Sequence, residues 1–381
     1  MATVDVIILH RLAGPDSGPL ERRLAAARLA VAEGHVTGFL AAGAATARIS
    51  GSRDAQPFGA RLATIRARLA PNRGLVLLGS GALALATGAD RRAFVAAAAG
   101  PGLVALANNR FSADIVAVSA AAGTTLNRVP AELPGDNALP RWLAEVAGVA
   151  VADLRSRWRL AVDLDSPLDV VLVDEYRATT NRARRARRAD ARPPRADLVD
   201  AVTNRIRAAL DGVRGVMADP RRELVIAGRT SAATLGWLER HARCRVRGLV
   251  EERGLRAASE LAVGPPTRGA ADPARPPRPP RSVLGALLDR DGPAALGERL
   301  AELGDAALVD SRVLLAHRLG GDEAGWPAAE SRYASDLLGA NAVADPWLAE
   351  LTAAAADGPI PIVLGGHTLV GPGVRLIAGG R

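Results

Sequence analysis

The sequence predicts an α/β protein: a mostly parallel sheet with helices on both faces, followed by a second, smaller α/β domain. Three observations predict this class. Short apolar runs alternate with longer helical patterns along the chain, as in βαβ units. Hydrophobic residues make up 49% of the chain but aromatic residues only 3%, so the core must consist mainly of Ala, Leu and Val. The length of 381 residues exceeds that of one average domain.

The first half contains several apolar runs of strand length, each followed by a helical pattern. Strands are predicted at residues 4–10, 36–42, 75–78, 103–107 and 160–163, and residues 108–118 form a polar cluster that leads into another strand. Helices are predicted at residues 20–33, ended by Gly34, at 58–69, and from a capping Asp90 to residue 99. This alternation indicates a mostly parallel sheet.

The second half repeats the pattern. Strands are predicted at residues 223–228, 245–250, 306–310 and 360–366. Helices are predicted at residues 197–213, 232–240, 282–288 and 293–303, and His317 lies on a further helix as a packed residue. We expect a first domain at 1–178, an Arg-rich linker at 179–196, and a second domain at 197–381 with a Pro/Arg-rich insertion at 265–281.

Arginine supplies all of the positively charged side chains, apart from histidine. All 49 basic residues are Arg, against 40 acidic residues, which gives a net charge of +9. Residues 182–195 hold seven arginines and one acid. Such a run can bind nucleic acid, but in Pro/Ala-rich surroundings a solvated linker is favoured. With few aromatic residues and no recognition motif, a nucleic-acid partner is the least favoured of our hypotheses.

The single cysteine and the short apolar runs of the chain bear on its disulfide chemistry and its location. Cys244 is the only cysteine, which excludes a disulfide framework within one chain. The N-terminal apolar run has no basic residues before it and predicts a strand rather than a signal peptide. No stretch of about 18 uncharged apolar residues occurs. We therefore expect a cytoplasmic protein without a membrane span, and the sequence leaves its oligomeric state open.

The acidic stretch at residues 163–169 is the most informative. On a strand, Asp163 and Asp165 would point to one face and could hold a divalent metal ion. Ser166 and Pro167 suit the start of a helix, and Asp169 would lie in its first turn. The alternative is an ordinary strand-to-helix corner with a solvated acidic turn.

Other polar segments also follow predicted strands. Because ligands bind at the carboxyl ends of strands in a doubly wound sheet, we expect these segments to share one edge with Asp163 and Asp165. The segments contain Gly79, Ser80, Gly81, Asn108, Asn109, Arg110, Ser112, Asp136 and Asn137. Asp114, at the end of one segment, is an alternative metal ligand.

The stretch from Asp163 to Asp169 resembles the D-x-D-[ST]-P-x-D corner of GT-A-like nucleotidyltransferases. The resemblance is to guanylyltransferases that activate phospholactate-type acids in deazaflavin cofactor synthesis, and more loosely to molybdenum-cofactor guanylyltransferases. It includes Asn137, Ala138 and Leu139 in a turn that lines the substrate, and it covers roughly residues 1–175. The resemblance implies a GT-A/Rossmann-like fold.

The resemblance also implies a reaction, in which an acceptor phosphate or carboxylate attacks the α-phosphorus of a nucleoside triphosphate. Asp163 and Asp165 would hold Mg²⁺, Arg11 and Arg110 would bind phosphates, and Asn108, Asn109 and Asn137 would orient the substrate. We count Asp163, Asp165 and Asn137 as catalytic.

The chain departs from this family in two places. Arg11 stands where a lysine-containing loop is usual, and Gly79-Ser80-Gly81 stands where many members have an aspartate that binds the metal ion. A binding or regulatory module without turnover is therefore the second hypothesis. No family is recognised for the second half, where Thr230, Ser231, Asp310 and His367 are the candidate site residues. A capped helix start and a structural or exposed histidine are the alternatives there.

Overall fold

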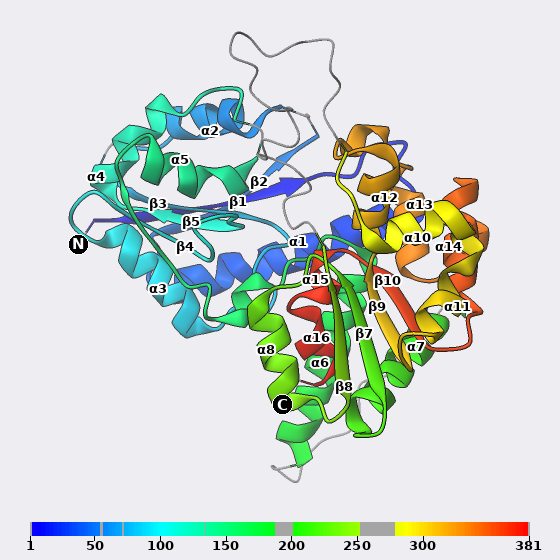
Figure 1. Cartoon of the computed structure of the whole chain (residues 1–381). Coiled ribbons are helices and arrows are strands. Elements are labelled where there is room, and N and C mark those ends of the chain that lie inside the picture. Colours follow the sequence, from blue (N-terminus) through cyan, green and yellow to red (C-terminus); the bar gives the residue numbers. More distant parts are fainter. Residues whose placement is uncertain are drawn as a thin grey trace, which may run out of the picture. The chain divides into compact units, whose positions relative to one another are not determined.

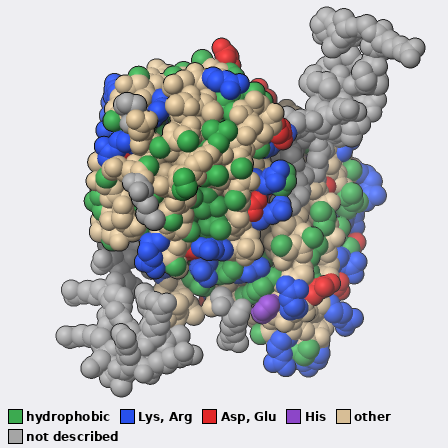
Figure 2. Space-filling model, turned by 90° about the vertical axis from the view of Figure 1, so that its left-hand side faces the viewer, with side chains coloured by type: hydrophobic (Ala, Val, Ile, Leu, Met, Phe, Trp, Pro, Cys, Tyr) green, Lys and Arg blue, Asp and Glu red, His purple; other side chains and the backbone are tan. Residues whose placement is uncertain are grey.

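The structure is a computed structural model, and it describes residues 2–53, 56–70, 72–133, 135–186, 201–251 and 279–379. The chain divides into two compact units, Met1–Asp165 and Ser166–Arg381 (Figure 1). The α/β class that the sequence predicts is confirmed for both. No helix among the described residues is long and apolar enough to cross a membrane. Arginine side chains are spread over the face shown in Figure 2, with apolar side chains between them.

The first unit is built on a six-stranded mixed sheet in the order β2-β1-β3-β5-β4-β6. Its strands are β1 (Val4–Arg11), β2 (Thr46–Ser52), β3 (Gly74–Gly79), β4 (Val104–Ala107), β5 (Ile115–Val118) and β6 (Ala150–Asp153). β5 is antiparallel to both of its neighbours, β3 and β4, while the other pairs are parallel. The sheet is therefore mixed.

Helices cover both faces of this sheet, as predicted. They are α1 (Pro19–Ala41), α2 (Phe58–Ala67), α3 (Gly88–Ala99), α4 (Ala120–Gly123) and α5 (Leu139–Glu145). Alternate residues of β1 serve the two cores, because successive side chains on a strand point to opposite faces. Val6 and Ile8 pack with Phe39 of α1, and Ile7 packs with Leu62 of α2. Figure 1 shows α1 and α3 on one face and α2 and α5 on the other.

Two predicted strands of the first half are wrong. Residues 36–42 continue α1, because His35 and Phe39 extend the buried stripe of Leu24 and Ala32 at helical spacing. Gly34 does not end this helix, which stops before Gly43, where φ is +100°. Residues 160–163 are not a strand either.

The segment Trp158–Ala161 is the 3₁₀ helix η3. Leu160, Val162 and Leu164 are buried at alternate positions, which produces a strand-like pattern without a partner strand. The first unit also contains two 3₁₀ helices, η1 (Thr124–Arg128) and η2 (Asp136–Ala138).

The second unit is built on a four-stranded sheet in the order β10-β9-β7-β8, in which every pair is parallel. Its strands are β7 (Glu223–Gly228), β8 (Arg245–Val250), β9 (Ala306–Asp310) and β10 (Ile362–Gly365). The predicted bounds of the first three agree with the structure.

The helices predicted at residues 197–213, 232–240, 282–288 and 293–303 are present with shifted ends, whereas the helices after residue 320 had no predicted bounds. The α-helices are α6 (Pro167–Ala186), α7 (Ala201–Ala218), α8 (Ala232–His241), α10 (Val283–Asp291), α11 (Leu296–Ala301), α12 (Ser311–Leu319), α13 (Ala329–Asp336), α14 (Pro346–Ala356), α15 (His367–Val370) and α16 (Gly373–Ile377). The 3₁₀ helices are η4 (Pro293–Ala295), η5 (Glu323–Gly325) and η6 (Ala340–Ala342). α7 packs on β7, β9 and β10.

The division between the units differs from the predicted boundary at residue 178, which falls inside α6. This helix contacts α13 and α16, and so it belongs to the second unit. The second unit is therefore the longer one, not the smaller. The predicted linker at 179–196 is helical through Ala186, and its remainder lies outside the described residues, as do residues 265–278 of the predicted insertion at 265–281.

The two described ends that flank residues 252–278 are joined by hydrogen bonds. The buried Glu251 accepts from the Ser282 hydroxyl at 2.6 Å and from the Val283 N–H at 3.1 Å. The Ser282 N–H donates to Nδ1 of His317 at 3.0 Å, and the other ring nitrogen lies 2.8 Å from Asp289. His317 is buried on α12, which confirms its prediction as a packed helix residue.

Candidate functional site

The carboxyl-end edge of the six-stranded sheet is the place where its topology favours a ligand. From β1 the chain crosses through α1 to β2 on one side, and then through α2 to β3 on the other side of β1. The edge between β1 and β3 is therefore a switch point of the kind at which α/β sheets bind ligands. Because β5 runs in the opposite direction, the residue that precedes it, Asp114, belongs to the same edge.

The glycine-rich turn after β3 is in close contact with the acidic stretch. Leu9 pairs with Gly79, and the N–H of Ser80 donates to the carbonyl of Leu9 at 2.8 Å. A Cβ atom on Gly81 would lie 2.9 Å from Oδ1 of Asp163, so only glycine allows this approach without a shift. The predicted neighbourhood of Gly79 to Gly81 and Asp163 is therefore present in the structure.

The side chain of Asn108 makes hydrogen bonds that connect three elements at this edge. Its amide nitrogen donates to Oδ2 of Asp114 at 2.8 Å and to the carbonyl of Leu160 at 2.9 Å. Its carbonyl oxygen accepts from the N–H of Asp114 at 3.0 Å. The buried Asn108 thus connects the end of β4, the start of β5 and η3. These contacts fix the orientation of the Asp114 side chain.

Four carboxylates influence one another at this edge: Asp114, Asp136, Asp163 and Asp165. Burial raises the pKa of Asp114 to about 7, and repulsion from Asp165 and Asp136 adds to the shift. Burial also raises the pKa of Asp163 well above its ordinary value, with further repulsion from Asp165 and Asp114. Burial likewise raises the pKa of Asp136. Like charges that crowd in this way favour a bound cation or a bound proton.

Asp163 and Asp165 lie in a loop after η3 and not on a strand, so the predicted side-by-side arrangement on one strand face is wrong. Asp163 is half-buried, and its Oδ1 accepts from the Leu164 N–H at 2.8 Å. Asp165 is exposed and lies 3.4 Å from a guanidinium nitrogen of Arg28. No group of three or more His, Cys, Asp or Glu side chains in the described ranges is arranged to hold a metal ion. Two carboxylates with retained water still suit Mg²⁺.

The remaining predicted residues of the first half lie toward the outside of this edge. Arg110 is exposed, with its guanidinium 5.1 Å from the ring centre of the exposed Phe111, while Asn109 accepts from the Phe111 N–H at 3.1 Å. Ser112 and Asn137 are exposed, although the Asn137 carbonyl accepts from Ala113 at 3.3 Å. Arg11 is exposed at the end of β1, where it pairs with Ser52.

Three side chains at the switch point were not among the predicted site residues: His10, Arg28 and Arg61. Nδ1 of His10 lies 3.1 Å from the hydroxyl of Ser80, and both residues are buried. Arg28 of α1 donates to the carbonyl of Leu164 at 2.6 Å. Burial lowers the pKa of His10, and the positive charges of Arg28 and Arg61 lower it further. The only sequence signal for His10 is its place at the end of a predicted strand.

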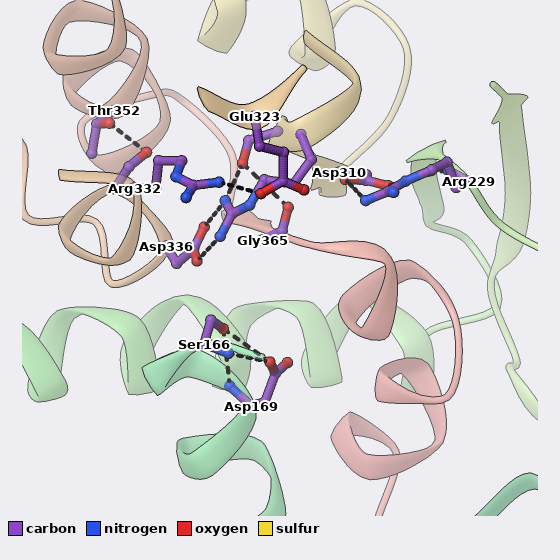
Figure 3. Close-up of polar contacts among 12 residues, drawn as sticks. Ser166, Asp169, Arg229, Asp310, Glu323, Arg332, Asp336, Thr352 and Gly365 are labelled. Atoms are coloured by element: carbon purple, nitrogen blue, oxygen red, sulfur yellow. Dashed lines mark hydrogen bonds and ion pairs between the residues drawn. The ribbon is translucent and has the colours of Figure 1, made fainter. Parts of the chain in front are cut away.

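The helix start at Ser166, which belongs to the second unit, agrees with its prediction. The Ser166 N–H donates to Oδ2 of Asp169 at 2.7 Å, and Pro167 is the first residue of α6 (Figure 3). The carboxylate of Asp169 also accepts from the Ser166 hydroxyl at 3.0 Å. Asp169 is thus a capping residue in the first turn.

The candidates of the second unit make structural contacts around the turn after β9. Asp310 accepts two hydrogen bonds from the guanidinium of Arg229, at 2.6 and 3.1 Å (Figure 3). Thr230 donates to the carbonyl of Val370 at 2.7 Å, and Ser231 caps α8. His367 is exposed at the start of α15.

Two further residues of the same turn connect it to the neighbouring elements. Ser311 donates to the carbonyl of Gly365 at 3.2 Å, at the end of β10. Arg312 donates to both oxygens of Asp336 at 2.6 Å each, at the end of α13. This set of charges pairs internally, which is typical of a structural network. We therefore place the candidate site in the first unit.

Comparison of the chain with protein-family models, with curated proteins and with solved structures gave no match.

Proposed function

We propose that the first unit binds a nucleoside triphosphate with Mg²⁺ and transfers the nucleoside monophosphate to a small acceptor that bears a phosphate or a carboxylate. The observation that carries this proposal is the crowding of Asp114, Asp136, Asp163 and Asp165 at the switch-point edge, with Arg28 among them. Crowded carboxylates select a divalent cation, and arginine binds phosphate oxygens through paired hydrogen bonds.

In the proposed reaction, an acceptor oxygen forms a bond to the α-phosphorus. The bond between that phosphorus and the bridging oxygen breaks, and pyrophosphate leaves with the electron pair. Asp163 and Asp165 would hold Mg²⁺, which supplies charge neutralisation when bound. The protein's own contribution is positioning: Asn108 orients Asp114, while Arg28 holds the loop of Leu164 and Asp165.

We further propose a GT-A-like fold for the first unit. The mixed sheet with its single antiparallel strand, the helices on both faces and the acidic loop at the carboxyl edge are compatible with it. A nucleotide and a small-molecule acceptor are thus the proposed partners, in the cytoplasm.

A catalytically inactive nucleotide-binding module is the second proposal, and Ser80 favours it. The turn after β3 offers the hydroxyl of Ser80, hydrogen-bonded to His10, where a further metal-binding carboxylate would strengthen catalysis. Loss of such a ligand affects turnover more than it affects nucleotide binding. The two proposals therefore differ in turnover and agree on affinity.

The test combines thermal shift with a turnover assay. The four nucleoside triphosphates are measured with and without Mg²⁺, on the wild type, on Asp165→Asn, and on Asp16→Asn, which changes an exposed aspartate in the turn after β1. A ligand at about 100 times its Kd stabilises the protein by roughly 2.7 kcal/mol. We expect an Mg²⁺-dependent shift for one nucleotide that Asp165→Asn loses and Asp16→Asn keeps.

Pyrophosphate release is then followed with a panel of small phosphorylated and carboxylic acids as acceptors. Release with one acceptor supports nucleotidyl transfer, and binding without release supports the inactive module. The absence of a thermal shift with every nucleotide contradicts both proposals.

A further inference from the structure

The β1/β3 edge carries four hydrogen-bonding side chains beside the carboxylates: His10, Ser80, Arg28 and Arg61. We propose that these four form a phosphate subsite that binds pyrophosphate, or the terminal phosphates of a nucleotide, without a metal ion. The nucleotide as the natural ligand rests on the proposed function. The binding of a pyrophosphate group rests on this geometry alone.

The His10–Ser80 pair forms the centre of the subsite. Leu9 and Gly79 are register partners on β1 and β3, so the residues that follow them leave the sheet side by side. The Ser80 main chain is fixed by its bond to the Leu9 carbonyl, and Nδ1 of His10 lies 3.1 Å from the Ser80 hydroxyl. This contact fixes the orientation of the imidazole and leaves Nε2 as the ring nitrogen that can meet a ligand.

Arg28 and Arg61 flank this pair from opposite faces of the sheet. On the β3 side, Nε of Arg28 lies 3.1 Å from the place that a Cβ atom on Gly81 would occupy. On the β2 side, the guanidinium of Arg61 donates to the carbonyl of Ser50, the register partner of Leu9. The two cations thus approach the same strand end from α1 and from α2.

The chemistry of these groups suits a multiply charged phosphate. The two guanidiniums supply positive charge and planar pairs of donors, which match phosphate oxygens. The two positive charges and burial lower the pKa of His10, so the imidazole is neutral near pH 7 and adds a donor without adding charge. With Nε2 protonated, Nδ1 accepts the only hydroxyl proton of Ser80, so the imidazole is the donor that this pair offers to the phosphate. The imidazole and the two guanidiniums together supply the donors of the subsite.

Each of the two arginines has an acidic neighbour, with which a bound phosphate would compete. Asp165 lies 3.4 Å from a nitrogen of Arg28, with side chains that are 48% and 27% exposed, and Asp136 attracts Arg61. A long and partly exposed ion pair is weak in water, so a phosphate with more charge can replace Asp165 beside Arg28. A bound divalent cation would neutralise the charges of Asp163 and Asp165 beside the subsite.

The experiment measures the binding of inorganic pyrophosphate by isothermal titration calorimetry, in EDTA and in Mg²⁺, with the full chain. We expect binding in EDTA. Arg61→Met and Arg28→Met should each weaken it by roughly tenfold to a hundredfold, the usual effect of losing a hydrogen bond between charged groups. Arg68→Met, which changes an exposed arginine just beyond the end of α2, should leave the affinity unchanged. Thermal unfolding without ligand checks that each variant is folded.

A variant whose binding can be restored by Mg²⁺ makes the test independent of destabilisation. Ser80→Asp adds a negative charge beside His10, and so we expect it to abolish pyrophosphate binding in EDTA and to restore binding only with Mg²⁺. Ser80→Asp with unchanged binding in EDTA overturns the inference. So does a wild type that binds nucleotide with Mg²⁺ but no pyrophosphate in EDTA, in which case the proposed function stands. Pyrophosphate binding in EDTA without any nucleotidyl transfer supports the inference while the proposed reaction fails.

Discussion

Removing one partner of the ion pair between Arg312 and Asp336 should destabilise the second unit strongly, whereas removing both partners should destabilise it much less. Asp336 is fully buried, and the Arg312 side chain is 12% exposed. Burial alone would lower the pKa of the Arg312 guanidinium, but attraction to Asp336 and Asp310 and the hydrogen bonds to Asp336 raise it. Asp336→Ala removes both 2.6 Å hydrogen bonds and leaves the cation buried. We expect a loss of about 3–5 kcal/mol in the free energy of unfolding.

The size of the second unit converts this loss into a temperature. For a unit of this length each kcal/mol corresponds to about 2–4 °C in Tm, so Asp336→Ala should lower Tm by roughly 6–20 °C. Differential scanning calorimetry measures it. The double variant Arg312→Met with Asp336→Leu removes both charges, and we expect it to regain most of the loss.

The exposed Glu350 on α14 provides the control, because Glu350→Ala should change the stability by less than about 0.5 kcal/mol. If the double variant is as unstable as Asp336→Ala, the reasoning is refuted: the loss would then come from packing and not from an unpaired buried charge.

Two further predictions concern the first unit. The pKa of Asp114 is raised to about 7 from 3.8, so its contribution to stability is complete below about pH 4 and is lost as the pH rises through 7. Asparagine mimics the protonated acid, so without divalent cations the Tm of the wild type minus the Tm of Asp114→Asn should fall from pH 5 to pH 8, and a rise in this quantity would contradict the assignment. Gly34→Ala should stabilise α1 by about 0.5–1 kcal/mol in urea unfolding, since no atom lies within 4 Å of the added methyl group. Gly38→Ala should not, because its methyl group would lie 2.7 Å from Arg91; equal gains at both positions would show that crowding is absent there.

The sequence predicted the elements that have a strong local signal. β7, β8 and β9 are compact apolar runs bounded by polar turns, and their predicted bounds agree with the structure. β2 was missed because it is an edge strand with half-exposed residues and little alternation. The extra length of α1 was missed because a glycine in a helix was interpreted as its end. Such errors arise where the local pattern is ambiguous and tertiary packing decides.

The candidate site was predicted only in part, because tertiary packing also decides which of its residues meet. The strand pattern predicted a carboxyl edge with Gly79 to Gly81 and Asp163, and the structure brings these residues together although residues 160–163 form no strand. The roles of Arg28 and Arg61 could not follow from it, because they depend on which helix faces reach the switch point. The direction of β5 also has no local signal, and it alone puts Asp114 on the acidic edge.

The hydrogen bonds that Glu251 accepts from Ser282 and Val283 bear on how the chain between these residues can vary in length. They hold the two flanking ends together whatever connects them, and the entropy of closing a loop grows only slowly with its length. A change in the length of the connection between these two ends should therefore add little free energy of loop closure. For protein engineering, this position is therefore a candidate site for inserting additional residues.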